Sequence, residues 1–434
     1  MTTSLAPGEV LDLAVGEVVH GGWCVCRVDD TGPVIFVRHA LPGERVRARI
    51  TQVTARFARA DATEILDPSP DRVDPPCPYA GPGRCGGCDW QHASLQAQRQ
   101  LKAAVVRQQL SRLAGLDREV VVEAVPGAGA DGLGWRTAVS FAVDEDGSAG
   151  LRRHRSREIV RISACLIAHP LVTDAAVPAR PWPGAEAVEV SAVPETGERG
   201  VLVTTRGRPG KAGTDRLESL EGVPADSVQL TGSRGGRVPV RGRGYLTRRA
   251  AGRDWRVTLG GFWQVHPGAA DLFGAAVLAA AQPRPGDTAL DLYCGAGLFT
   301  GLLAEAVGPA GSVVGIEADA GTARDARHNL RPWPRARVLT GDAARLLSAD
   351  QPWLGAASVA VLDPPRTGAE RAVIDALCGP GLRRIAYLSC DPATLARDLR
   401  LLLDRGGWRL AGLRAFDAFP MTHHVECLAT LTRD

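Results

Sequence analysis

Short apolar runs separated by turn residues fill residues 8–66. In order, the runs are VGEVVH, WCVCRV, PVIFVRH, ERVRARITQV and FARADATEIL. Several short strands broken by turns at regular intervals are typical of a small β-barrel. We therefore expect residues 1–68 to form an OB-like barrel.

A proline-rich stretch, DPSPDRVDPPCPYAGPG, follows the barrel and excludes regular structure, because each proline removes a backbone donor. After it, Ser94 can cap a helix that ends at Gly115. The helix carries apolar residues at helical spacing, namely Leu101, Val105, Val106, Leu110 and Leu113. We expect residues 93–119 to be a linker helix, and residues 69–92 and 120–258 to form a central β-rich domain.

From about Arg284, apolar strand-like runs alternate with amphipathic helical segments. The strand-like runs are TALDLYCG, SVVGIEAD, ARVLTGDA, VAVLDPPR and IAYLSCD, with two later strands, WRLAGLRAFD and VECLATLT. Such alternation predicts an open α/β sheet that binds ligands at the carboxyl ends of its strands. The predicted fold class is α/β, with a Rossmann-like domain over residues 259–434.

Composition narrows the class of protein without naming a partner. The 434 residues suffice for about three domains, and the 45% apolar fraction excludes a disordered chain. With 51 basic and 48 acidic residues the formal charge is +3, which neither requires nor excludes nucleic acid. No signal peptide opens the sequence and no apolar run reaches ~18 residues. We expect a cytoplasmic protein without a membrane segment.

Basic residues in the barrel recur near aromatic ones. Trp23, Phe36 and Phe57 lie close in sequence to six arginines, which are Arg38, Arg45, Arg47, Arg49, Arg56 and Arg59. A surface that follows a phosphate backbone and stacks bases needs both residue types. A solvated strand face explains the same pattern, so RNA binding and a plain surface stay open here.

The run Asp291 to Gly297, DLYCGAG, ends a predicted strand and begins a helix, where glycines let a ligand approach the backbone. Glu317 ends the next strand, where a carboxylate can bind ribose hydroxyls. These residues predict a nucleoside cofactor, either NAD or S-adenosylmethionine. Gly341-Asp342 and Asp363-Pro364-Pro365-Arg366 follow the next two strands and favour S-adenosylmethionine, although each acid alone could simply cap a helix.

Cys390 stands at the end of the fifth predicted strand, before a helix that begins near Pro392. A helix N-terminus lowers the pKa of a thiol, and the thiolate is the nucleophilic form. Glu426 begins the last strand, which borders the fifth in this fold. A nucleophile and a base are therefore predicted to share one site.

Four other cysteines, Cys77, Cys85, Cys88 and Cys165, have metal-ligand character. The first three form C-x₇-C-x₂-C in the proline-rich segment. Four thiolates suit either tetrahedral zinc or a [4Fe–4S] cluster, and their spacing alone does not distinguish the two.

The runs SCDPATLARDL, FPMTHHVE, DLYCGAG and GFWQV together resemble the RNA uracil-5-methyltransferase family, in particular its ribosomal-RNA branch. The resemblance spans essentially the whole chain, and residues 8–66 resemble a TRAM domain, an RNA-binding module. It implies a class I methyltransferase domain in which Cys390 adds to carbon 6 of a target uracil and Glu426 removes the proton from carbon 5.

The same resemblance implies further roles. Phe262 would stack on a flipped base, and the four cysteines would hold a [4Fe–4S] cluster. The S-adenosylmethionine site would be lined by Gln264, Tyr293, Glu317, Asp342 and Asp363. The chain departs from many relatives, which carry asparagine at the positions of Leu298 and His266, and each departure removes a polar contact.

Alternative functions make different demands on the same residues. A transfer-RNA substrate fits similar parts, whereas a cytosine-5 methyltransferase would carry a Pro-Cys pair that the Cys390 loop lacks. A non-catalytic RNA-binding Fe–S protein would not need an intact Cys390 and Glu426. An NAD oxidoreductase would need a complete G-x-G-x-x-G, but position 300 is Thr300. We expect a monomer that binds RNA, with ribosomal RNA as its leading substrate.

Overall fold

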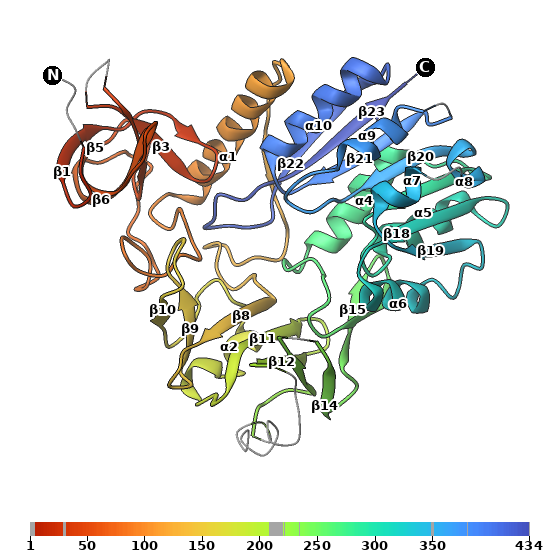
Figure 1. The fold of residues 1–434 in the computed structure, drawn as a ribbon, viewed down its shortest axis with the longest axis horizontal. Coiled ribbons are helices and arrows are strands. Elements are labelled where there is room, and N and C mark those ends of the chain that lie inside the picture. The colour runs from red at the N-terminus through yellow and green to blue at the C-terminus, as the bar shows by residue number, and fades with distance from the viewer. Residues whose placement is uncertain are drawn as a thin grey trace.

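The computed structural model describes residues 5–28, 32–207, 220, 222–233, 235–348, 351–379 and 381–433. Three bodies lie at three corners of the molecule, with the N-terminal barrel beside a long helix, a central sheet below, and an α/β domain opposite the barrel (Figure 1). This arrangement brings segments from all three bodies to the middle of the molecule.

The N-terminal body is a six-stranded sheet in the order β1-β5-β6-β4-β3-β2. Its alternating pattern buries Val46, Ala48 and Ile50 on one face of β5. The barrel predicted from the sequence is confirmed. The strands are β1 (Val10–Ala14), β2 (Val18–Val19), β3 (Trp23–Cys26), β4 (Val34–Arg38), β5 (Arg45–Val53) and β6 (Phe57–Asp67).

Helix α1 (Leu95–Gln109) joins the barrel to the α/β domain. The Ser94 hydroxyl accepts a hydrogen bond from the Ala97 amide at 3.2 Å, as predicted for an N-cap. A π-helical turn, Leu110–Ala114, continues the helix to Gly115, whose φ of 66° makes it a left-handed stop. One side of α1 packs in the barrel core and the other in the core of the α/β sheet.

The central body is a seven-stranded sheet in the order β10-β9-β8-β11-β12-β13-β14. It is antiparallel except where β12 runs parallel to β13. A separate hairpin leads toward the α/β domain. The elements are β8 (Ala138–Val143), β9 (Ala149–Arg152), β10 (Ile159–Arg161), α2 (Pro170–Thr173), a 3-10 turn (Val177–Ala179), β11 (Ala185–Val193), β12 (Glu198–Thr205), β13 (Ser227–Gly232), β14 (Arg237–Arg241), and the hairpin β15 (Tyr245–Ala250) and β16 (Arg253–Thr258).

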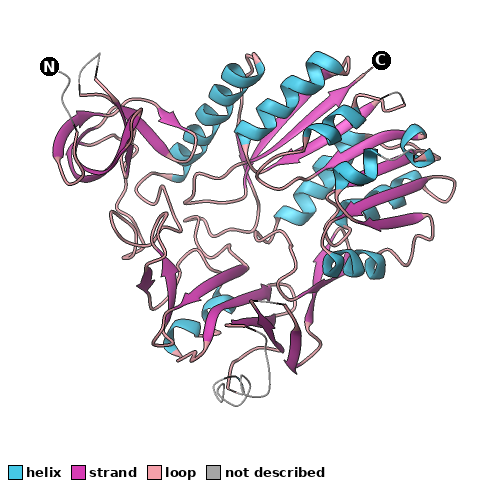
Figure 2. Ribbon diagram, in the orientation of Figure 1, coloured by secondary structure: helices cyan, strands magenta, loops and turns pink. Residues whose placement is uncertain are grey.

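The C-terminal body is an eight-stranded sheet in the order β19-β18-β17-β20-β21-β23-β22-β7. Helices cover both faces (Figure 2): α4 and α5 pack on one, and α1, α9 and α10 on the other. The strands are β17 (Thr288–Leu292), β18 (Ser312–Glu317), β19 (Ala336–Thr340), β20 (Ala357–Leu362), β21 (Arg384–Ser389), β22 (Arg409–Asp417) and β23 (Glu426–Thr432). The helices are α4 (Ala269–Ala281), α5 (Leu298–Val307), α6 (Ala320–Asn329), α7 (Ala343–Ser348), α8 (Pro352–Gly355), α9 (Arg371–Leu377) and α10 (Pro392–Arg405).

One assignment from the sequence is wrong. Strand β7 (Val122–Ala124) lies within residues 120–258, which we assigned to the central domain, but it pairs in parallel with β22 and forms the edge of the α/β sheet. Three residues give too short a pattern to reveal their partner, and the pairing joins segments almost 300 residues apart.

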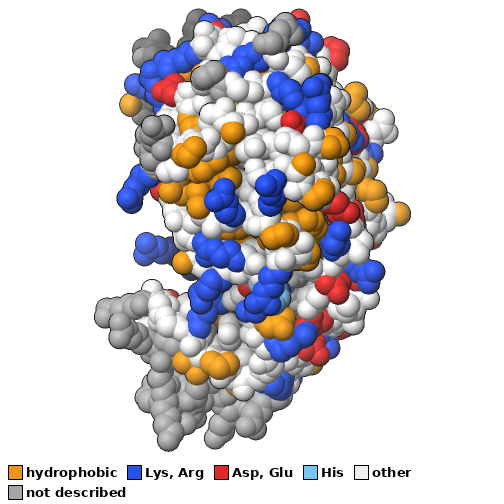
Figure 3. All heavy atoms as spheres, turned by 90° about the vertical axis from the view of Figure 1, so that its right-hand side faces the viewer, with side chains coloured by type: hydrophobic (Ala, Val, Ile, Leu, Met, Phe, Trp, Pro, Cys, Tyr) orange, Lys and Arg blue, Asp and Glu red, His pale blue; other side chains and the backbone are white. Residues whose placement is uncertain are grey.

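Two surface observations complete the fold. On the face at the right of Figure 1, arginine side chains are spread among apolar and uncharged ones (Figure 3), in keeping with the small net charge. Of the helices in the described ranges, none is both long enough and apolar enough to cross a membrane.

Candidate active site

A cavity of about 1290 Å³ opens at the carboxyl ends of the parallel strands. Strand β17 lies between β18 and β20, so the chain reverses its direction of sheet growth there, which is where open α/β sheets bind ligands. The structure brings all seven predicted cofactor and catalytic residues to this one cavity. They are Gln264, Tyr293, Glu317, Asp342, Asp363, Cys390 and Glu426.

The loop after β17 has the backbone shape that close approach to a ligand requires. Tyr293, Gly295 and Gly297 all have positive φ angles, of 66°, 56° and 93°. A Cβ built on Gly295 would meet no atom within 4 Å, so its backbone faces open space. Glu317 is held in front of this loop, because its carboxylate accepts hydrogen bonds from the Gly295 amide at 3.0 Å and the Asp319 amide at 2.8 Å.

The other acids of this cavity differ in their surroundings. Asp342 is exposed and accepts a hydrogen bond from the Arg345 amide at 2.9 Å, so it caps α7 as well as lining the cavity. Burial raises the pKa of Asp363 to about 7. Carboxyl groups with raised pKa values gather where a protein binds or transforms a charged ligand.

Cys390 and Glu426 meet because of strand pairing. Strand β21 runs antiparallel to β23, with Ser389 opposite Cys427, so the residue after one strand lies beside the first residue of the other. Glu426 is 5% exposed, and its Oε2 atom has no hydrogen-bond partner among the described residues. Burial, and then the charge of Asp363, raise the pKa of Glu426 well above its usual value. An unpartnered, basic carboxylate facing a cavity is suited to take a proton from a ligand.

The expectation of a lowered thiol pKa is wrong. Burial, followed by the charge of Glu426, raises the pKa of Cys390 to about 12, and Arg366 opposes this only in part. The helix N-terminus does not help, because its amides at Ala393 and Thr394 already donate to the Asp391 carboxylate at 3.0 and 2.9 Å. The capping side chain thus places a negative charge beside the thiol, and the thiol is protonated in the free protein.

The structure adds residues to the predicted cofactor and catalytic set. His424 and Arg366 line the same cavity and contact each other at 3.1 Å between Nε2 and Nη2. His20, in the barrel, contacts the Asp391 carboxylate at 3.2 Å. A lone histidine in a barrel turn carries no sequence signal that it reaches a strand end 370 residues later.

At the two positions that depart from the family pattern, the side chains are buried and pack against their neighbours. Leu298 is buried in the core on α5, together with Phe299 and Leu302. His266 is buried, stacks on Trp135 with ring centres 5.9 Å apart, and has a pKa lowered to about 4 by burial. Neither residue lines the cavity.

The four candidate metal cysteines also come together. Cys77, Cys85, Cys88 and Cys165 line a second cavity of about 370 Å³ between the proline-rich segment and the central sheet, and all four are free thiols. Cys85 and Cys88 accept hydrogen bonds from the Gly87 amide and from Gln91. Across the described ranges, no three His, Cys, Asp or Glu side chains converge tightly enough for one metal ion. Four free thiols around one cavity have the ligand chemistry of either tetrahedral zinc or a [4Fe–4S] cluster.

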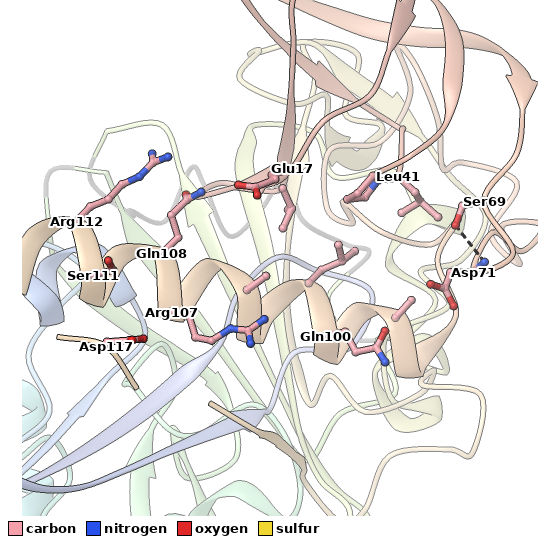
Figure 4. A pocket seen from close by; sticks show the side chains of 15 residues that line it. Glu17, Leu41, Ser69, Asp71, Gln100, Arg107, Gln108, Ser111, Arg112 and Asp117 are labelled. Carbon is pink, nitrogen blue, oxygen red and sulfur yellow. Dashed lines mark hydrogen bonds between the residues drawn. The ribbon is translucent and has the colours of Figure 1, made fainter. Parts of the chain in front are cut away.

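A further groove, of about 670 Å³, runs along α1 on its barrel side. Arg107, Gln108 and Arg112 lie along the helix, and Glu17 and Leu41 come from the barrel (Figure 4). None of the predicted site residues borders this groove.

The fold and the cavity together are those of an S-adenosylmethionine-dependent methyltransferase. A crystal structure of the Pyrococcus abyssi tRNA (uracil-54, C5)-methyltransferase with S-adenosyl-L-homocysteine superposes with a TM-score of 0.70 at 22% identity, over 97% of this chain and 100% of that one. A model of the protein-L-isoaspartate (D-aspartate) O-methyltransferase family matches residues 269–350. The class follows from the fold, and sequence comparison defines the family.

The TRAM domain model matches residues 5–63, and the tRNA (Uracil-5-)-methyltransferase model matches residues 354–434. An uncharacterized RNA methyltransferase of Streptomyces coelicolor is 51% identical, covering 98% of this chain and 93% of that protein. The 23S rRNA (uracil(1939)-C(5))-methyltransferase of Chromohalobacter salexigens is 32% identical, covering 97% and 89%. The chain belongs to the RNA uracil-5-methyltransferase family.

Proposed function

We propose that this protein methylates carbon 5 of one uridine in 23S ribosomal RNA, through a transient bond between Cys390 and the base. A relative that shares nearly its whole length is named for that reaction on 23S rRNA, and the TRAM domain supplies an RNA-binding module. The observation that carries the proposal is the convergence of Cys390 and the unpartnered Glu426 Oε2 in one cavity at the sheet edge.

Uracil chemistry explains why both residues are needed. Carbon 5 is a poor nucleophile until a group adds at carbon 6 and places enolate electron density on it. The Cys390 thiolate forms the carbon 6–sulfur bond, and carbon 5 then takes the methyl group. Glu426 removes the carbon 5 proton, the ring double bond re-forms, and the carbon 6–sulfur bond breaks to return the thiolate.

Because the Cys390 pKa is raised in the free protein, the thiol proton must pass to solvent in the cavity before the carbon 6–sulfur bond forms. The Arg366 guanidinium already lowers the pKa of both Cys390 and Glu426, and a bound cation would act in the same direction. Substrate-dependent activation keeps the thiol unreactive until the site is filled.

The same cavity supports the proposed cofactor residues. Glu317, held by two backbone amides, would bind ribose hydroxyls, Asp342 the adenine amino group, and Gln264, Tyr293 and Asp363 the remaining polar groups. S-adenosylmethionine, when bound, supplies an electrophilic methyl group. Phe262, whose side chain is 61% exposed at the cavity wall, is placed to stack on a base drawn out of the RNA.

We further propose that Cys77, Cys85, Cys88 and Cys165 hold a [4Fe–4S] cluster. Methylation by this route moves no net electrons, so the cluster would shape the RNA site rather than react. The chain would act as a monomer.

Deletion of the gene, followed by mapping of 5-methyluridine in ribosomal and transfer RNA, tests the proposed function. One 5-methyluridine should disappear from 23S rRNA and return with the wild-type gene but not with Cys390→Ala. Loss of a transfer-RNA modification instead would reassign the substrate, and an unchanged modification map would reject the proposal.

A further inference from the structure

A smaller cavity, of about 360 Å³, lies where the three bodies meet and shares Cys390 with the methyl-transfer cavity. Arg366 and His424 also border both cavities. The barrel and the central domain supply the opposite wall, with His20, Trp23, Phe36, Arg59, His154 and Arg155. The cavity is therefore built only when all three bodies are assembled.

This cavity carries an excess of positive charge, because three arginines, Arg59, Arg155 and Arg366, line it beside one carboxylate, Asp391, whose ion-pair contact is with His20. Some barrel arginines form ion pairs, as Arg38 does with Asp89 and Arg47 with Asp12. Arg59 instead donates to the neutral Gln52 side chain at 2.5 Å, and Arg155 has no hydrogen bond or ion pair with the residues that the structure describes. Burial, and then the charge of Arg155, lower the pKa of Arg59, so the two guanidiniums repel each other. Two such groups around one cavity favour an anion between them.

Aromatic rings stand beside the two arginines. The Arg59 guanidinium lies over the Trp23 ring, 5.5 Å from its centre, and Phe36 meets Phe57 edge to face at 5.4 Å. Single-stranded nucleic acid is bound by this combination, because guanidiniums pair with phosphates while aromatic rings stack on bases. An acidic peptide would use the arginines but would leave the aromatic wall without a partner.

We propose that this cavity binds the nucleotide directly flanking the target uridine, with Arg59 and Arg155 on its phosphate and the half-buried Phe36 against its base. The inference rests on the proposed function, because the shared Cys390 fixes where the target base lies. An RNA strand that places one base against Cys390 in the larger cavity must pass the phosphate of its next nucleotide through the smaller cavity.

Binding of a fluorescein-labelled RNA of about 15 nucleotides, centred on the mapped uridine, tests the inference by fluorescence anisotropy. Arg59→Gln and Arg155→Gln should each weaken binding roughly tenfold. The double variant Arg59→Gln/Arg155→Gln should also reduce the slope of log Kd against log salt by about 0.7, the value for one lost phosphate contact on a single strand, and each single variant should reduce it by less. Arg400→Gln is the matched control, because it removes an exposed arginine that pairs with Asp404 on α10 and lines neither cavity.

A thermodynamic cycle locates the phosphate. The phosphate linkages on the two sides of the uridine are replaced, one at a time, by a neutral methylphosphonate. Only one of the two replacements should weaken binding to the wild-type protein. The same replacement should cause a smaller loss in Arg59→Gln or Arg155→Gln than in the wild type, and no further loss in the double variant. Independent, multiplicative losses at both linkages, or variants that bind like Arg400→Gln, would overturn the inference.

The two possible failures are distinguishable. Wild-type protein that methylates no RNA rejects the proposed function and this inference with it. Wild-type protein that methylates its RNA while the arginine variants keep full affinity rejects the flanking-nucleotide site alone. Preserved thermal unfolding of the variants confirms that any loss is local.

Discussion

The methyl-transfer cavity and the cysteine-lined cavity are both ringed by ionisable side chains, but they are built differently. The first gathers six of its seven predicted residues from the ends of six neighbouring strands, whose order fixes which side chains meet, and Gln264 from the segment after β16. The second gathers three cysteines from an irregular proline-rich segment and one from a distant loop. Strand order assembles most of the first site, whereas the second depends on how loops pack.

The two cavities also differ in which of their groups have raised pKa values. In the methyl-transfer cavity the carboxyls of Asp363 and Glu426 have raised pKa values and surround a protonated thiol, an arrangement suited to proton transfer. In the cysteine-lined cavity burial raises the pKa values of Cys85, Cys88 and Cys165.

The largest expected effect is in the strand-built cavity. Cys390→Ala should reduce methylation at least ~10⁴-fold, because the route to a nucleophilic carbon 5 is lost. S-adenosylmethionine affinity, measured by calorimetry, should change less than about twofold, since the cofactor residues stay in place. Full turnover by this variant would remove the covalent mechanism.

The second-largest expected effect concerns the contact between helix α1 and the α/β domain. Lys102 of α1, fully buried, forms an ion pair with Asp417 and donates to the Phe419 carbonyl at 3.0 Å, where the segment leading to Glu426 begins. Lys102→Ala should lower the free energy of unfolding by about 3–5 kcal/mol in urea, because it leaves a buried carboxylate unpaired. The exposed Arg107→Ala, which breaks a pair with Glu119, should cost less than about 1 kcal/mol. Equal losses would contradict this role of Lys102.

The contrast also explains what could be predicted from the sequence. Strands β17 to β23 have strong apolar runs, so the meeting of Cys390 with Glu426 followed from the order of the elements. The raised pKa of Cys390 did not, because it depends on Asp391 capping α10 and on carboxylates from other strands. The contact of His20 with Asp391 and the pairing of β7 with β22 join distant segments, and no local pattern encodes either.

In the loop-built cavity, anaerobically purified protein should be brown and hold about four iron atoms per chain. Cys88→Ser should lower the iron content to less than about one per chain. Cys378→Ser is the matched control, because Cys378 is a half-buried thiol outside this cavity. Stoichiometric zinc without iron in the wild-type protein would defeat the cluster assignment.

The smallest effect concerns the free thiol of Cys390. With a pKa of about 12, roughly one molecule in 10⁵ carries the thiolate at pH 7, and this fraction rises tenfold with each pH unit until the pKa is reached. The rate of alkylation by iodoacetamide, followed by mass spectrometry of the Cys390 peptide, should therefore rise with a slope of one in log rate between pH 7 and 9. A rate already constant above pH 7 would show that the thiol is ionised in the free protein.

The most direct test of the central claim is mass spectrometry of Glu426→Gln after reaction with its RNA and S-adenosylmethionine. Because the glutamine cannot take the carbon 5 proton, the Cys390 peptide should carry a methylated uridine that survives denaturation. Retained turnover without an adduct, or an adduct on any other cysteine, would contradict the pairing of Cys390 with Glu426.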